Sequence, residues 1–282
     1  MEYKTILVHV DESGRAHEQI RIAALLAQKY NAHLIGAAAT GVAPQLLMPG
    51  VIGDSNLALL SQTLGELREH AANLLTEFES VAWNMDVKSF EKRLIEDDAG
   101  AALVLQARYS DLVVIGQLNP ADYSPILRAD FQEYVLMNSG RPVLFVPYAG
   151  HFPQLGKRVL VAWDGSMEAT RAVSASIPLL QRADLVQVLV FDSGWPTDTH
   201  GEQPGTDIAL YLARHGIKVE VSEQKMPADI DVGNALLSHA ADFGADLIVM
   251  GGYGHTRFRE VLLGGVTRTV LASMTVPVLM SH

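Results

Sequence analysis

The chain has 282 residues, which is enough for two ordinary domains or one large one. Its formal net charge of −11 argues against a broad nucleic-acid-binding surface. The absence of cysteine excludes disulfides, thiolate catalysis and zinc–cysteine sites.

Targeting and membrane segments are not expected. Residues 1–13 lack the charged region followed by a long apolar region that marks a signal peptide. No run of about 18 apolar residues occurs, so no spanning helix is predicted. Since 49% of the residues are hydrophobic, a packed core is feasible. The simplest expectation is a soluble, cytoplasmic protein.

The first part of the chain predicts alternating strands and helices. Strands are expected near 4–10, 32–39, 85–91, 111–115 and 142–147. Helices are expected near 14–30, 56–82, 97–108 and 130–138. Apolar, β-branched strands that alternate with helices indicate a parallel sheet covered on both faces.

The second part of the chain predicts the same alternation. Strands are expected near 157–163, 184–191, 217–223, 246–250 and 276–280. Helices are expected near 166–182, 205–216, 230–244 and 265–274. The chain therefore predicts two α/β domains of the same architecture.

An internal repeat supports this division. The matching segments are ILVHVDES (6–13) with VLVAWDGS (159–166), DLVVIG (111–116) with DLIVMG (246–251), and RPVLFV (141–146) with TVPVLM (275–280). The two copies span 1–148 and 156–282, and residues 151–156 link them. The last strand of each copy is a sheet edge that needs cover, so the two copies are expected to pair with each other.

Glycines follow the fourth strand of the second copy. Gly251 and Gly254 come directly after it, and nine residues separate Gly254 from Gly264, which Gly265 follows. Because glycine has no side chain, backbone can approach a ligand closely here. The helix predicted from Gly265 then opens with bare N–H groups, which suit a phosphate. The alternative is that a doubly wound fold needs tight turns and glycine supplies them.

A second part of the same candidate site follows the first strand of that copy. Ligands of open parallel sheets bind at the carboxyl ends of the strands, where the strand order reverses. Asp164 ends the first strand and Gly251 ends the fourth, so a reversal between these strands would bring the two residues together. Trp163 precedes Asp164 and either shapes an adenine pocket or packs in the core.

With these copies and this glycine spacing, the chain resembles the universal stress protein family over nearly its whole length. The family signature is Gly-x2-Gly-x9-Gly, usually followed by a small hydroxyl residue. Gly251, Gly254 and Gly264 match it, whereas Gly265 stands where serine is common. The resemblance implies two doubly wound five-stranded parallel-sheet domains of the adenine-nucleotide alpha-hydrolase-like type. It also implies the strand order 3-2-1-4-5 and an internal pseudo-dimer, with a homodimer of whole chains left open.

The resemblance implies ATP as the ligand, with ADP and AMP left open and Mg²⁺ accompanying the nucleotide. In the family, the loop holds the phosphates and ribose and the aspartate contacts the nucleoside, which here would be Asp164. By the same resemblance, Gly265, Val266 and Thr267 would meet the phosphates. His255 adds positive charge and Thr267 a hydroxyl donor, while the missing hydroxyl at position 265 lowers the expected affinity.

The first copy has lost this signature. Asn119 and Ala129 stand at the second and third glycine positions, and Asp130 stands at the position of Gly265. The spacing of Asp130 and Glu133 predicts a helix cap whose carboxylate satisfies the helix N–H groups and repels phosphate. We therefore predict that a nucleotide binds the second copy. The alternative is that both sites are vestigial.

Three classes of function follow. The first is a stress-response or regulatory protein that binds an adenine nucleotide in the second copy. The second is an interaction module, or a module for an apolar ligand, that needs no nucleotide. The third is an enzyme, which is disfavoured because the sequence offers no coherent nucleophile–base pair and no metal cluster. Slow ATP hydrolysis stays open.

Overall fold

The structure, a computed structural model, describes residues 2–42, 57–119, 121, 127–192, 204–225, 231–254 and 263–282. These residues form two compact units. We call Tyr3–Arg141 the N-terminal unit and Pro142–His282 the C-terminal unit. None of the helices in the described part of the chain is long and apolar enough to cross a membrane.

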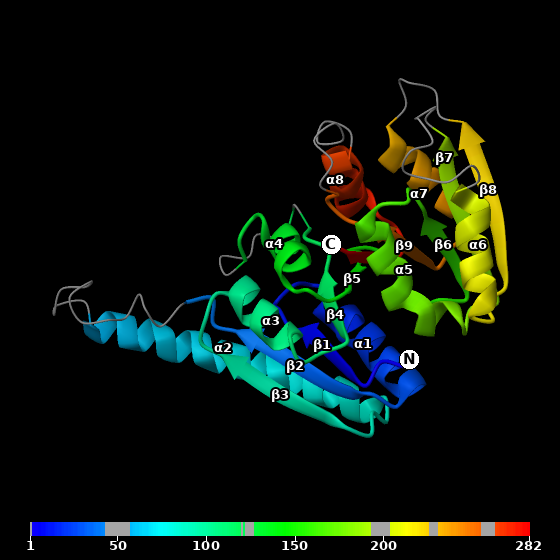
Figure 1. The fold of residues 1–282 in the computed structure, drawn as a ribbon. Coiled ribbons are helices and arrows are strands. Elements are labelled where there is room, and N and C mark those ends of the chain that lie inside the picture. Colours follow the sequence, from blue (N-terminus) through cyan, green and yellow to red (C-terminus); the bar gives the residue numbers. More distant parts are fainter. Residues whose placement is uncertain are drawn as a thin grey trace. The chain divides into compact units, whose positions relative to one another are not determined.

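The N-terminal unit is a parallel sheet between two layers of helices (Figure 1). Its strands are β1 (Thr5–His9), β2 (His33–Ala39), β3 (Phe90–Ile95) and β4 (Leu112–Gly116). Its helices are α1 (Ala16–Tyr30), α2 (Leu57–Asn84), α3 (Ala99–Ala107) and α4 (Phe131–Asn138). The strand order is β3-β2-β1-β4, with α1 and α2 packed together on one face and α3 and α4 on the other.

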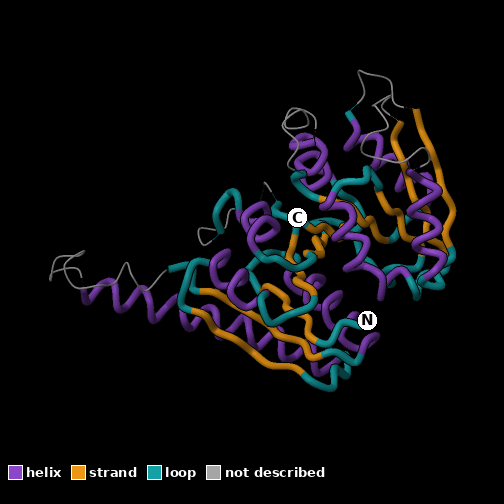
Figure 2. The backbone as a smooth tube through the Cα atoms, in the orientation of Figure 1, coloured by secondary structure: helices purple, strands orange, loops and turns teal. Residues whose placement is uncertain are grey.

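The C-terminal unit repeats this architecture, as the tube in Figure 2 shows. Its strands are β5 (Val143–Val146), β6 (Arg158–Ala162), β7 (Leu185–Asp192), β8 (Val219–Lys225), β9 (Leu247–Gly251) and β10 (Val278–Ser281). Its helices are α5 (Met167–Leu180), α6 (Pro204–Arg214), α7 (Val232–Phe243) and α8 (Leu263–Ser273). Counted along the second repeat, the order β8-β7-β6-β9-β10 is 3-2-1-4-5, which confirms the prediction.

β5 is the strand that the sequence repeat and the compact unit assign differently. It comes from the first repeat, yet it belongs to the C-terminal unit and pairs antiparallel with β10. In the register of this pairing, Phe145 lies opposite Val278, and both side chains are fully buried. The predicted pairing between the last strands of the two repeats is therefore confirmed.

An aspartate at the start of the fourth strand explains one of the repeated motifs. Asp246 accepts hydrogen bonds from the backbone N–H groups of Gly156 and Arg158, at 3.0 and 3.1 Å. Asp111 does the same in the N-terminal unit for Lys4 and Thr5, at 2.7 and 2.9 Å. Each carboxylate joins the start of the first strand to the start of the fourth, so these acids are structural and lie at the amino ends of the strands.

The predicted start of one strand was wrong. The strand expected at 85–91 begins only at Phe90, because α2 continues to Asn84 and then closes with a turn. The N–H of Val87 bonds back to the carbonyl of Ala82, and Asp86 adopts a left-handed conformation with φ of 55°. These residues therefore terminate the helix and cannot extend the strand.

Candidate functional site

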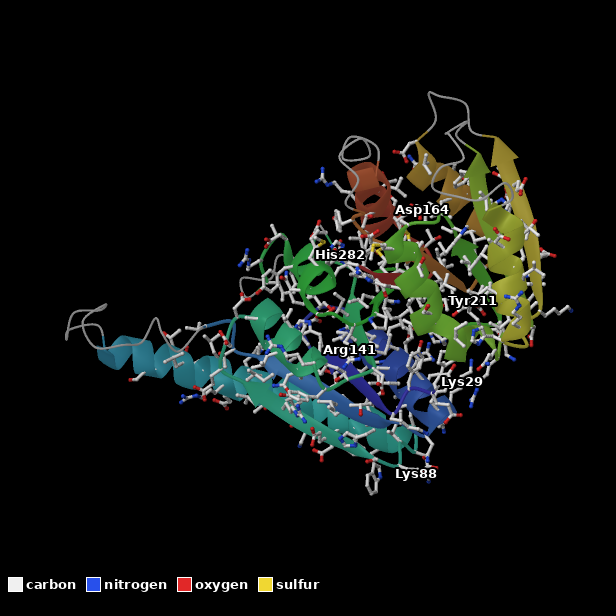
Figure 3. All side chains as sticks on the ribbon, in the orientation of Figure 1. Lys29, Lys88, Arg141, Asp164, Tyr211 and His282 are labelled. Atoms are coloured by element: carbon white, nitrogen blue, oxygen red, sulfur yellow. The ribbon has the colours of Figure 1, made fainter. Side chains whose placement is uncertain are left out.

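The carboxyl ends of β6 and β9 meet where the strand order of the C-terminal unit reverses. β6 pairs with β7 on one side and with β9 on the other. The register places Val161 opposite Val249, so the residues that follow β6, Trp163 and Asp164, lie beside Gly251. Asp164 is labelled in Figure 3. The structure therefore brings together the two segments that the sequence proposed as one site.

Asp164 shapes the turn that leads into α5. Its Oδ1 accepts the N–H of Ser166 at 3.0 Å, and Ser166 Oγ accepts the N–H of Ala169 at 3.1 Å. Ser166 is thus the N-cap residue of α5. Asp164 is partly exposed, and so is Trp163, whose backbone N–H bonds to Leu189. One carboxylate oxygen of Asp164 therefore has a structural role, and the side chain still borders solvent.

Gly251 is required by packing. A Cβ at this position would lie 2.6 Å from the backbone nitrogen of Ala169 and 2.9 Å from Cβ of Glu168. Real Cβ atoms do not approach backbone so closely, so β9 can end against the first turn of α5 only with glycine here. The packing of β9 against α5 therefore explains this glycine without any ligand.

Gly254 lies against a buried carboxylate. A Cβ at Gly254 would lie 3.3 Å from Oε2 of Glu168, a residue that is only 6% exposed. Within the described residues, Glu168 has no hydrogen bond or ion pair to its carboxylate. The sequence analysis missed Glu168. Its position in the first turn of the helix after Asp164 was the available signal, but many helices carry an acidic residue there.

The other two glycines open α8. This helix begins at Leu263, two residues earlier than predicted, so Gly264 and Gly265 both lie in its first turn. N–H groups of a first turn have no partner within the helix. A Cβ at Gly265 would meet nothing within 4 Å, so the space beside this turn is open in the described structure. His255 lies outside the described residues.

Val266 and Thr267 lie beneath the loop. Val266 is 8% exposed and Thr267 is 2% exposed. Thr267 Oγ1 accepts the N–H of Tyr253 at 3.2 Å, and Tyr253 adopts a left-handed backbone with φ of 51°. This bond ties the residues after β9 to α8. The hydroxyl therefore positions the loop, in addition to the phosphate contact that the resemblance implied.

The corresponding region of the N-terminal unit is filled by side chains. Phe131, the first residue of α4, is 2% exposed, and its ring centroid lies 5.0 Å from that of His9. Gln132 donates to the carbonyl of Gly116 at 3.3 Å. The fully buried side chain of Gln19 fills the space above Gly116, where a Cβ would lie 2.5 Å from Oε1 of Gln19.

The predicted capping role of Asp130 was wrong. Asp130 is the N-cap residue of α4, but its side chain makes no capping hydrogen bond. Its carboxylate instead accepts two hydrogen bonds from Arg128, each 2.9 Å long. The hydrogen bond and charge of Arg128 hold the pKa of Asp130 below its ordinary value. Two parallel bonds from a guanidinium outcompete the weaker backbone donors.

A buried contact between an aspartate and a histidine lies at the end of β1 in the N-terminal unit. Oδ2 of Asp11 lies 3.4 Å from Nδ1 of His9, and Oδ1 of Asp11 accepts the N–H of Ser13 at 3.0 Å. Burial raises the pKa of the Asp11 carboxyl, but the hydrogen bonds and charge of His9 and the bonds of Ser13 outweigh it. The net pKa of Asp11 therefore lies below its ordinary value.

The strand reversal of the C-terminal unit is suited to bind an anion with a polar group beside it. The N–H groups of the first turn of α8 have no partner within the helix, a Cβ at Gly265 would meet open space, and Asp164 and Glu168 offer acceptors on α5 and the turn before it. No group of three or more His, Asp or Glu side chains suited to a metal ion occurs in the described residues.

The chain thus consists of two doubly wound α/β repeats, one of which has the Gly-x2-Gly-x9-Gly spacing at its strand reversal. The model of the universal stress protein family matches residues 2–147 and 156–282. The chain therefore belongs to the universal stress protein family.

Comparisons with individual proteins agree with this membership. The chain is similar to universal stress protein Slr1230 of Synechocystis, with 27% identity over 150 residues that make up 52% of this chain and 49% of that protein. The match thus spans about half the length of this curated relative.

Two solved structures share the fold over 98% of this chain. A universal stress protein from Archaeoglobus fulgidus is 19% identical, with a TM-score of 0.73 and 94% of its chain covered. A putative universal stress protein from Pseudomonas aeruginosa is 17% identical, with a TM-score of 0.55 and 92% of its chain covered.

Proposed function

We propose that this chain is a stress-response regulatory protein that binds ATP or a related adenine nucleotide in its C-terminal repeat, residues 156–282. The observation that carries the proposal is the start of α8. Gly265 leaves the first turn of this helix beside open space, and the Gly-x2-Gly-x9-Gly spacing leads into it. A helix N-terminus with free N–H groups favours phosphate.

Six of the nine predicted site residues have a definite role in this proposal. Trp163 and Asp164 would border the nucleoside, because they follow β6 at the strand reversal. The backbone around Gly264 and Gly265 would meet the phosphates. Gly251 and Thr267 would act indirectly, since the first allows β9 to end against α5 and the second fixes the residues after β9.

The N-terminal repeat, residues 1–148, is expected to bind no nucleotide. Phe131, Gln132 and Gln19 fill the region where the ends of its first and fourth strands meet. Repulsion by Asp130 is a smaller part of the reason, because Arg128 balances that charge. We therefore expect one nucleotide per chain.

Direct calorimetric titration with ATP tests the proposal, using nucleotide-free protein and the variant Gly265→Asp. The variant places a carboxylate at the open first turn, where like charges about 4 Å apart cost about 1 kcal/mol in water and more in a cleft. Saturable binding near one ATP per chain that weakens at least about tenfold in the variant is the expected result.

Gly14→Asp is the matched control. Gly14 also borders open space, with nothing within 4 Å of a Cβ, but it lies in the N-terminal unit. This variant adds the same charge and should leave ATP binding unchanged. If folded, nucleotide-free wild-type protein gives no heat with ATP, ADP or AMP, the proposal fails. The nucleotide-independent interaction module, or a module for an apolar ligand, would then replace it.

A further inference from the structure

Glu168 is a largely buried acid that lies against the residues after β9. It lies in the first turn of α5 and is 6% exposed, and its Oε2 faces Gly254 in the glycine loop. No described residue donates a hydrogen bond or a positive charge to its carboxylate. An ionised carboxylate with so little exposure favours a partner that donates hydrogen bonds.

The N-terminal unit also buries a glutamate in the first turn of the helix after its first strand, three positions further along the repeat than Glu168, and it satisfies that glutamate internally. Glu18 also lies in the first turn of the helix after the first strand, and it is 7% exposed. Arg21 donates two hydrogen bonds of 2.8 Å to its carboxylate. The repeat without a glycine loop thus supplies an internal partner, and the repeat with the loop supplies none within the described residues.

An outside partner for Glu168 must donate hydrogen bonds, because an ionised carboxylate is only an acceptor. A phosphate group does not fit, since it would add a second negative charge. A vicinal diol fits well, because its two neutral hydroxyls can donate to the two carboxylate oxygens. Ribose carries such a diol, and an acidic residue performs this role in dinucleotide-binding folds.

The position of Glu168 agrees with a ribose. Glu168 follows Asp164, which borders the proposed nucleoside position, by four residues. Gly254 lies next to Tyr253, which the Thr267 hydroxyl ties to α8, the proposed phosphate anchor. Glu168 thus borders the residues after β9 on the side of α5. In a nucleotide the ribose joins the base to the phosphates, so we place the ribose beside Glu168.

Building on the proposed function, we propose that Glu168 accepts hydrogen bonds from the ribose hydroxyls of the bound nucleotide. The site then selects ribonucleotides over nucleotides that lack the 2′ and 3′ hydroxyls. Without the diol, the carboxylate would stay buried and unpaired beside the ligand. Loss of such charged hydrogen bonds corresponds to about ten- to a hundredfold in affinity.

The test is calorimetric titration of the full chain with ATP and with 2′,3′-dideoxy-ATP, each with Mg²⁺ and with a chelator. Wild-type protein should bind ATP at least about tenfold more tightly than the dideoxy analogue. In Glu168→Gln this ratio should fall to within about threefold, because the neutral amide keeps the volume but only one acceptor oxygen. Glu18→Gln, the matched control, should keep the wild-type ratio.

Each other outcome overturns the inference. Equal binding of the two nucleotides by wild-type protein, or an unchanged ratio in Glu168→Gln, would show that the carboxylate does not contact the ribose. If the substitution removes only a dependence on Mg²⁺, Glu168 is a cation ligand and the inference is wrong. If wild-type protein binds neither nucleotide, the proposed function itself has failed, and the ATP titration alone shows this.

Thermal unfolding provides a check on folding that is independent of any ligand. Glu168→Gln removes an acidic side chain that the dipole of α5 favours, so its unfolding temperature without nucleotide should fall only slightly. Glu18→Gln breaks a buried ion pair and should lower the unfolding temperature more. A fall for Glu168→Gln as large as that for Glu18→Gln would indicate an internal partner for the carboxylate, and would overturn the inference.

Discussion

The two repeats differ most where the ends of their first and fourth strands meet. In the N-terminal unit, Phe131 packs against His9, and Gln19 covers Gly116. In the C-terminal unit, the first turn of the corresponding helix holds Gly264 and Gly265, and a Cβ at Gly265 would meet nothing within 4 Å. The sheets have the same strand order, so the sheet topology alone does not distinguish the two repeats as binding sites. The side chains at the start of this helix do distinguish them.

The largest effect is expected when the filled region is emptied. Phe131→Ala removes a buried ring that contacts His9, and such truncations cost about 3–5 kcal/mol of unfolding free energy. Val266→Ala, at the matching position of the other repeat, should cost less, about 1–2 kcal/mol, because fewer buried atoms are lost. Denaturant unfolding measures both. Equal costs would show that the two helix starts are packed alike.

The next effect concerns the two glycines that end the fourth strands. Gly251→Ala should cost roughly 3 kcal/mol, because its Cβ would meet the backbone of Ala169 at 2.6 Å. Gly116→Ala should cost less, because its Cβ would meet only the side chain of Gln19, which can shift. Denaturant midpoints of the two variants compare them directly. If Gly116→Ala lowers the unfolding free energy more than Gly251→Ala does, the Gln19 side chain cannot shift to make room for the added Cβ.

A smaller effect should depend on pH. The pKa of Asp11 is lowered in the folded state, so its ionised form stabilises the protein above its unfolded pKa of about 3.9. That contribution is lost as the pH falls through the lower folded pKa. Asp11→Asn should therefore destabilise by about 2 kcal/mol at neutral pH, and the difference from wild type should shrink below about pH 4. Urea unfolding at several pH values measures it, and a constant difference would contradict the ionised contact with His9.

The smallest expected effect is a difference in unfolding free energy between serine-to-alanine changes at the starts of α5 and α1. Ser166→Ala should cost about 1 kcal/mol, because Ser166 Oγ caps α5. Ser13→Ala should cost almost nothing through capping, since Arg15 is the N-cap residue of α1 and no side chain caps that helix. Thermal unfolding of both variants checks the contrast. An equal loss in Ser13→Ala would mean that both serines stabilise their turns in the same way.

The repeat and the alternation of strands and helices could be predicted because each depends on local pattern and spacing, and the strand order followed from the family resemblance. The two segments proposed as one site do lie at the same strand reversal. Prediction failed where a local alternative competes with the predicted contact or element. The Asp130 carboxylate prefers Arg128 to its own helix, and the turn around Asp86 delays β3. Glu168 could not be predicted as a loop contact, because only the packing of β9 on α5 brings it to Gly254.

The pairing of β5 with β10 has a consequence for any attempt to isolate one repeat. A chain cut between residues 148 and 156 would hold a whole repeat in each fragment, yet it would separate these two strands. Each fragment would then expose an apolar edge strand with unpaired backbone groups. We expect such fragments to associate with one another or with themselves through that edge. The covalent link between the repeats is thus a safeguard against aggregation as well as a means of keeping two unequal copies together.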